Sequence, residues 1–211
     1  MSDVSSEDVL EFWFETAATD ERAVAAKTLR WFRGGEAFDR QVVERFADAV
    51  ETAVERGLGA WESSPRGRLA LVILLDQLTR NVFRGTPRMY AGDARAQALA
   101  LDAFADGSAA ALPFVEQLFL ALPLLHSESL AHHDREAEIA QAVAPTAPPL
   151  FRPMAAMWLE QIAKYRGVIA RFGRFPHRNA LLGRASTPGE IEFLADWDAK
   201  APPEGMPSDS S

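Results

Sequence analysis

The stretch LALVILLDQLTRNVFRG, residues 69–85, constrains the fold more than any other part of the chain. Its first seven residues are all apolar, so a helix formed by them has no face suited to water and must be surrounded by other elements. The chain has no sustained apolar–polar alternation and no Asn-Gly hairpin turn, which are the usual signals of strands. The surrounding elements are therefore predicted to be helices.

Periodic apolar residues predict helices along nearly the whole chain. Besides 65–83, helical stripes cover about 9–14, 23–57 with a break at Gly34-Gly35, 94–105, 114–122, 129–143, 150–172 and 187–197. Ser64-Pro65 and Thr187-Pro188-Gly189-Glu190 are helix-start signals, and Asp93 is expected to cap the helix over 94–105. We predict an all-α fold of about eight to nine helices. It forms a single domain over 1–200, followed by a disordered tail over 201–211.

The bulk composition excludes several classes of protein. The 211 residues include no cysteine, which rules out disulfides and thiolate metal sites. A net charge of −8 argues against nucleic-acid and anionic-membrane partners, which require a basic face. The longest apolar runs fall far short of the roughly 20 residues that span a bilayer. The acidic N-terminus does not resemble a signal peptide, so a cytoplasmic protein is expected.

Positive charge is nevertheless concentrated in two windows. Residues 161–189 contain six Lys or Arg and no Asp or Glu, and residues 77–92 contain three Arg and no acid. Within the first window, RFGRFPHRN (171–179) places three arginines and a histidine in a turn stiffened by Pro176. Guanidinium groups suit carboxylate and phosphate. Two interpretations stay open: a receptor for an anion, or ion pairs with acids elsewhere in the fold.

A ladder of polar residues follows the apolar run. Asp76 shares a helical stripe with Arg80, and Gln77, Asn81 and Arg84 occupy the adjacent stripe. A buried Asp or Arg requires a partner. The ladder is therefore either a structural salt bridge between Asp76 and Arg80 or one wall of a binding cleft.

Three segments resemble a bacterial family known only as domain of unknown function number 924. They are LDQLTRNVFRGTPRMYAGDARAQALA (75–100), LPLLHSESLAHHDR (122–135) and GVIARFGRFPHRNALLGRASTPGEIEFL (167–194), with FWFE near the N-terminus as a fourth, weaker match. The resemblance implies a TPR-like helical array, that is, an α-α superhelix, and it supplies no established reaction or catalytic residue. Ser129, where the family favours Asp, and Tyr165, near which it favours His, depart from the family pattern.

The motif positions define the predicted ligand-binding residues. They are Asp76, Gln77, Arg80, Asn81, Arg84, His126, Glu128, Arg171, Arg174, His177, Arg178 and Asn179. We expect Arg80 and Arg84 on one wall of a cleft and Arg174, His177, Arg178 and Asn179 on the other. The cleft is expected to bind a small anionic metabolite or to act on it. His177 is the only candidate acid–base residue, because an unperturbed imidazole titrates near neutrality.

Other chemistries have weaker support in the sequence. A triad of Ser127, His177 and Asp76 lacks a nucleophile elbow. The histidines of 126–133 lack the spacing of a metal motif, and no glycine-rich phosphate loop is present, so neither a metal nor a cofactor is expected. Two rival functions stay open: a TPR-like module that grips a partner peptide, and arginine networks that are purely structural.

Overall fold

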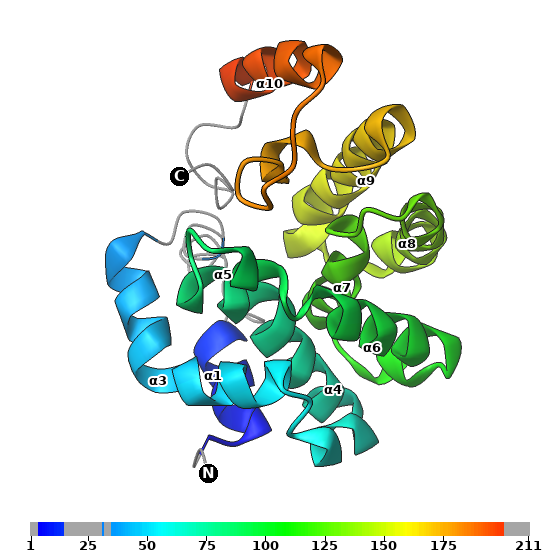
Figure 1. The fold of residues 1–211 in the computed structure, drawn as a ribbon. Coiled ribbons are helices and arrows are strands. Elements are labelled where there is room, and N and C mark those ends of the chain that lie inside the picture. Colours follow the sequence, from blue (N-terminus) through cyan, green and yellow to red (C-terminus); the bar gives the residue numbers. More distant parts are fainter. Residues whose placement is uncertain (1–3, 15–30, 32–34, 201–211) are drawn as a thin grey trace.

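The computed structural model describes residues 4–14, 31 and 35–200, and every regular element among them is helical (Figure 1). The main helices are α1 (Ser6–Phe14), α3 (Glu36–Val54), α4 (Pro65–Val72), α5 (Thr79–Val82), α6 (Asp93–Ala105), α7 (Phe114–Leu125), α8 (Leu130–Val143), α9 (Arg152–Phe172) and α10 (Pro188–Lys200). The all-α prediction is confirmed, whereas the TPR-like assignment stays a prediction. Residues 23–30 and 32–34 of the helix expected over 23–57, and the tail expected over 201–211, lie outside the described residues.

Helix α4 lies at the centre of the molecule. Residues 69–75 have no solvent exposure at all. They belong to α4 and to η2 (Ile73–Leu78), which together contact α1 and α3 on one side and α6 and α7 on the other (Figure 1). This all-round contact explains why the run LALVILL has no polar face.

Helices α6, α7, α8 and α9 pack in the order in which they occur along the chain (Figure 1). Helix α7 is buried along its whole length except at Gln117, even though Pro123 lies in its last turn. Its sequence FVEQLFLALPLL is accordingly almost entirely apolar. Residues 126–129 connect the buried end of α7 to the start of α8.

Two helix starts follow the local signals in the sequence. The Ser64 hydroxyl accepts a hydrogen bond from the Gly67 amide at 3.1 Å and caps α4. At the start of α10, the Thr187 amide donates to the Glu190 carboxylate at 2.7 Å, and the Glu190 amide donates to the Thr187 hydroxyl at 3.3 Å. This reciprocal pair is the capping box that the sequence predicts.

A second, small apolar cluster joins α10 to the end of α9. Its buried members are Val168, Ile169 and Phe175. Phe193 and Trp197 of α10 pack against them. The turn over 171–184, which contains the RFGRFPHRN segment and η7 (Pro176–Arg178), is thereby held between α9 and α10.

Candidate functional site

A π-helical turn, η2, interrupts the central helix and carries Asp76. Such a turn shifts the register of the side chains that follow and is frequent at functional sites. Gly92 allows the turn to be packed closely, because a Cβ at this position would lie 2.2 Å from the carbonyl oxygen of Leu75. The Thr79 hydroxyl donates to that same oxygen at 2.7 Å.

Asp76 is completely buried and has three polar partners. The Nδ1 atom of His126 lies 2.8 and 3.0 Å from the two carboxylate oxygens, so the imidazole donates to them. The Gln77 amide donates at 2.6 Å, and a nitrogen of Arg80 lies 3.7 Å away. Burial alone would raise the pKa of Asp76, but His126, Arg80 and Gln77 together hold it below its usual value. The carboxylate is therefore ionised inside the core.

Arg80 also joins Asp76 to a second cluster. It donates to the Asp93 carboxylate at 2.8 Å and to the carbonyl oxygen of Met89. Arg178, from the 171–184 turn, lies 3.5 Å from the other oxygen of Asp93. Both guanidinium groups lie against the ring of Tyr90, at 4.8 and 4.5 Å from its centroid. The structure thus brings Arg80 and Arg178 together on one carboxylate, whereas the cleft expected between them stays a prediction.

The expected capping role of Asp93 is wrong. Gly92 occupies the N-cap position of α6 and Asp93 is the first helical residue. The carboxylate points to the two arginines instead of to the amides of its own helix. Two cationic partners attract the carboxylate more strongly than uncharged amides would, which accounts for the difference.

Glu128 organises the far side of the 171–184 turn. Its carboxylate accepts two hydrogen bonds from Arg184, at 2.7 and 2.9 Å, and one from the Phe175 amide at 2.8 Å. Arg184 also donates to the side-chain oxygen of Asn179 at 3.0 Å. Burial would raise the pKa of Glu128, but Arg184 and the Phe175 amide lower it below its usual value.

Three other predicted site residues pair elsewhere. Arg174 binds the Glu190 carboxylate at 2.6 and 2.8 Å, and these contacts help to lower the pKa of Glu190 to about 2. Asn81 and Arg84 both donate to Asp39 of α3, at 2.7 Å and at 2.6 and 3.0 Å. Arg84 therefore faces α3 and does not share a carboxylate with Arg80.

The histidines occupy four different environments. His177 packs between the rings of Phe175 and Trp197, with centroid distances of 5.3 and 6.2 Å. His132 shares a hydrogen bond of 2.8 Å with the Ser127 hydroxyl, and the buried His133 donates its Nε2–H to the Ser127 carbonyl at 2.8 Å. Among the described residues, no cluster of three or more His, Asp or Glu side chains is suited to a metal ion.

Sequence reasoning missed several residues of this network. Tyr90 lies within the acid-free window 77–92 and Asp93 directly follows it, so both could have been included on that ground. Glu136, with no exposure, accepts a hydrogen bond from the Trp158 indole at 2.9 Å. Nothing in the local sequence marks it, because a glutamate on an amphipathic helix is normally exposed.

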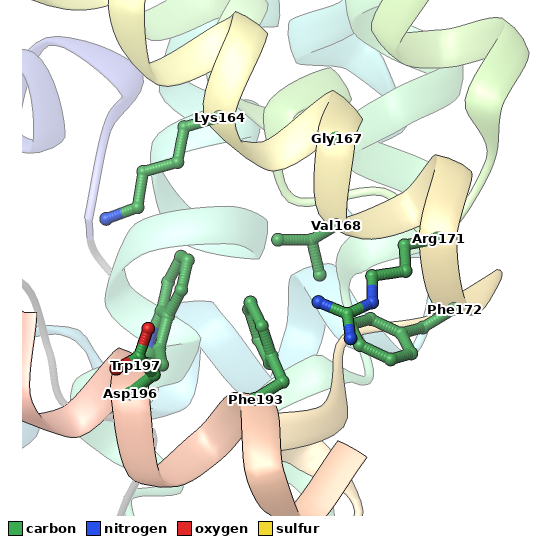
Figure 2. A pocket seen from close by; sticks show the side chains of 8 residues that line it. All are labelled: Lys164, Gly167, Val168, Arg171, Phe172, Phe193, Asp196 and Trp197. Atoms are coloured by element: carbon green, nitrogen blue, oxygen red, sulfur yellow. The ribbon is translucent and has the colours of Figure 1, made fainter. Parts of the chain in front are cut away.

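A pocket of about 320 Å³ opens between α9 and α10 (Figure 2). Two basic side chains reach it, Lys164 and Arg171 of α9, and Asp196 lies at the same end as Lys164. The remaining lining residues are Gly167, Val168, Phe172, Phe193 and Trp197. Of the predicted ligand-binding residues, Arg171 alone is among those that line this pocket.

Comparison with known proteins places the chain in a family. The model of a family described as bacterial protein of unknown function (DUF924) matches residues 9–198. The chain belongs to this family. A solved structure, that of a protein of unknown function from Agrobacterium tumefaciens, is similar to this chain with 34% identity and a TM-score of 0.74. The similarity covers 90% of this chain and 97% of the other.

These relatives assign no activity to the family member described here. No curated protein matches the chain significantly. Within the described ranges, no helix has both the length and the apolar character needed to cross a membrane. Function must therefore be argued from the site itself.

Proposed function

We propose that the protein binds a small anionic molecule with a flat apolar body in the pocket between α9 and α10. The supporting observation is that Arg171 reaches this pocket beside aromatic side chains, while the arginines on either side of it in the first basic window contact carboxylates. Arg166 binds Asp134 at 2.6 Å, and Arg174 binds Glu190. Arg171 instead lies over the ring of Phe172 at 4.7 Å.

The aromatic lining suits a planar ligand. Phe193 and Trp197 stand side by side on α10 and face the pocket, with their ring centroids 5.3 Å apart (Figure 2). The Lys164 ammonium lies 4.0 Å from the centroid of the Trp197 ring, and burial lowers the pKa of Lys164. Small-molecule sites commonly combine apolar walls with a few polar groups that fix orientation.

The charges predict how the ligand is oriented. Asp196 and Lys164 lie at one end of the pocket and Arg171 lies at the other (Figure 2). The guanidinium fork of Arg171 attracts a carboxylate or phosphate, whereas the positive charge of Lys164 at the other end is accompanied by the negative charge of Asp196. The anionic group is therefore expected at Arg171, with the ring of the ligand against Phe193 and Trp197.

A matched pair of probes tests the proposal. Calorimetric titration should show that 1-naphthoate binds the wild-type protein and that its uncharged analogue 1-naphthamide binds much more weakly. Arg171→Gln should weaken 1-naphthoate binding by about tenfold, the effect expected for losing one charge-assisted contact. Arg152→Gln, which removes an exposed cation at the opposite end of the same helix, should leave binding unchanged.

Three results would overturn the proposal. The first is equal affinity for the acid and the amide, because it would show that no cation recognises the probe. The second is unchanged 1-naphthoate binding by Arg171→Gln. Failure of wild-type protein to bind 1-naphthoate at millimolar concentration would also count against a pocket of this chemistry.

The structural interpretation of the arginines gains support at the 171–184 turn itself. Arg174, Arg178 and Arg184 each contact a carboxylate of a distant segment. Their role there is to hold the turn in place, and the proposed ligand does not require them. Among the described residues, no groove gives similar support to the interpretation as a peptide-binding module. The cytoplasmic location stays a prediction.

A further inference from the structure

The contact between Asp76 and His126 fixes the chemistry of the imidazole ring. Neither residue lines the proposed binding pocket. Asp76 has no exposure, whereas the side chain of His126 is 28% exposed. Since Nδ1 is turned toward the buried carboxylate, the solvent-facing part of the ring is the side that carries Nε2. A carboxylate bound to Nδ1–H fixes the neutral tautomer in which Nε2 has a free lone pair.

The neighbours of Asp76 hold this arrangement in place. The Gln77 amide occupies the carboxylate oxygen Oδ2 at 2.6 Å, and Arg80 contributes positive charge at 3.7 Å from Oδ1. The π-helical turn and the close contact with Gly92 fix the backbone that carries Asp76. The carboxylate therefore has no freedom to turn away from His126.

We propose that His126 is an acid–base residue whose Nε2 withdraws a proton from a water molecule or from a hydroxyl group of a substrate. In this step the O–H bond breaks, the N–H bond forms at Nε2, and the electron pair stays on the oxygen, which becomes nucleophilic. The Asp76 carboxylate stabilises the imidazolium that results. Asp76 is the positioning residue, because it acts only through His126.

The other three histidines lie in different surroundings. His133 is fully buried and has its Nε2–H bound to a backbone carbonyl. His132 has a serine hydroxyl at Nδ1 where His126 has a carboxylate, and His177 is packed between two aromatic rings. His126 is therefore a second candidate, beside His177, for the acid–base role expected from sequence.

The first test needs no variant. Long-range proton–nitrogen correlation spectra of protein labelled with ¹⁵N-histidine report the tautomer of each neutral imidazole. We expect His126 to carry its proton on Nδ1 and His133 to carry it on Nε2. A neutral His126 protonated on Nε2 would overturn the proposal, because its lone pair would then face Asp76.

The second test measures the reactivity of Nε2 directly. Diethyl pyrocarbonate acylates neutral imidazole nitrogen, and mass spectrometry of peptides gives a rate for each histidine. His126 should be modified fastest, and Asp76→Asn should slow its modification by about tenfold because an amide can bind Nδ1 as a donor and reverse the tautomer. Asp134→Asn, an exposed carboxylate of α8, should leave the rate unchanged.

The remaining histidines serve as internal controls for folding. If Asp76→Asn unfolds the protein, the buried His133 becomes reactive, and the decision then rests on the wild-type tautomer and rates. A wild-type His126 that reacts no faster than His132 and His177 contradicts the proposal. So does a folded Asp76→Asn variant with an unchanged rate at His126. Neither outcome depends on whether 1-naphthoate binds.

Discussion

At the scale of single residues, the most unusual group is the buried carboxyl of Glu136. One of its oxygens accepts the Trp158 hydrogen bond, and the other has no hydrogen-bond partner among the described residues. Burial raises the pKa of Glu136 well above its ordinary value of 4.5, and the negative charge of Asp76 raises it further. Glu136 is therefore a neutral acid in the folded protein over a range of pH in which the unfolded chain ionises it.

This difference predicts how stability depends on pH. Between about pH 4.5 and the raised pKa, the folded state binds more protons than the unfolded state, so the contribution of Glu136 to the free energy of unfolding falls as pH rises. The amide introduced by Glu136→Gln cannot ionise, so the variant should not show this fall in the free energy of unfolding as pH rises. Urea unfolding at pH 5, 6, 7 and 8 should show a flatter profile for the variant than for wild type, with the variant gaining most at pH 8.

Glu138→Gln is the matched control, since Glu138 is exposed on the same helix and pairs with the neighbouring Arg135. It should leave the pH profile of stability close to that of wild type, because exposed ion pairs contribute about 0–1 kcal/mol. A Glu136→Gln profile that parallels wild type would show that Glu136 does not ionise on unfolding in this range.

At the scale of elements, the 171–184 turn is held mainly by contacts to residues far away in sequence. Glu128 is the central acceptor, with Arg184 and the Phe175 amide bound to it at 2.7–2.9 Å. The side chains of Glu128 and Arg184 are 29% and 24% exposed, so the pair is partly shielded from water. Loss of the Glu128–Arg184 pair should lower the free energy of unfolding by more than loss of an exposed ion pair.

Glu128→Ala should lower the free energy of unfolding by about 2 kcal/mol, the range for hydrogen bonds to a charged group. Hydrogen exchange should accelerate at amides of 174–184 while α4 and α7 keep their protection. Glu192→Ala, an exposed carboxylate on α10, should change neither quantity. Equal effects of the two substitutions would contradict the role assigned to Glu128.

The 171–184 turn and the start of α10 show which features a sequence can predict. The Thr187–Glu190 capping box was predictable because both partners lie within one helical turn. Gly173, with φ of 70°, ends α9 as a glycine at that position commonly does. The sequence could also indicate that the arginines of the turn need anions.

Which anions they meet was not predictable, because the pairing depends on how helices pack. Arg178 meets Asp93 across 85 positions of sequence, and Arg184 meets Glu128 across 56. The π-helical turn at Asp76 was equally hidden, since the residues 69–85 fit an uninterrupted helix. The pocket between α9 and α10 was missed because its walls include α10, which the arginine motif does not reach.

At the scale of the whole molecule, the apolar residues divide into two unequal clusters. The large one extends from α1 to α9 and contains no residue of α10. The small one joins the end of α9 to α10 through Phe193 and Trp197. Helix α10 is therefore peripheral to the main core, although it forms one wall of the proposed binding pocket.

This division predicts the result of truncation. A chain ending at Ser186 should still unfold cooperatively, because it keeps every residue of the large cluster. It should lose about 3 kcal/mol of stability, from the partial exposure of aromatic side chains at the end of α9, and it should lose 1-naphthoate binding altogether. Far-UV circular dichroism should fall by the signal of the 13 residues of α10.

A second chain ending at Lys200 separates the role of α10 from that of residues 201–211. It should bind 1-naphthoate as the full chain does, because all the residues that line the pocket are present. Tautomer spectra of the Ser186 truncation should still show His126 protonated on Nδ1, since Asp76, Gln77, Arg80 and His126 all lie outside the segment removed. A truncation that unfolds without cooperativity, or that loses this tautomer, would show that α10 is integral to the core and that the two sites are not independent.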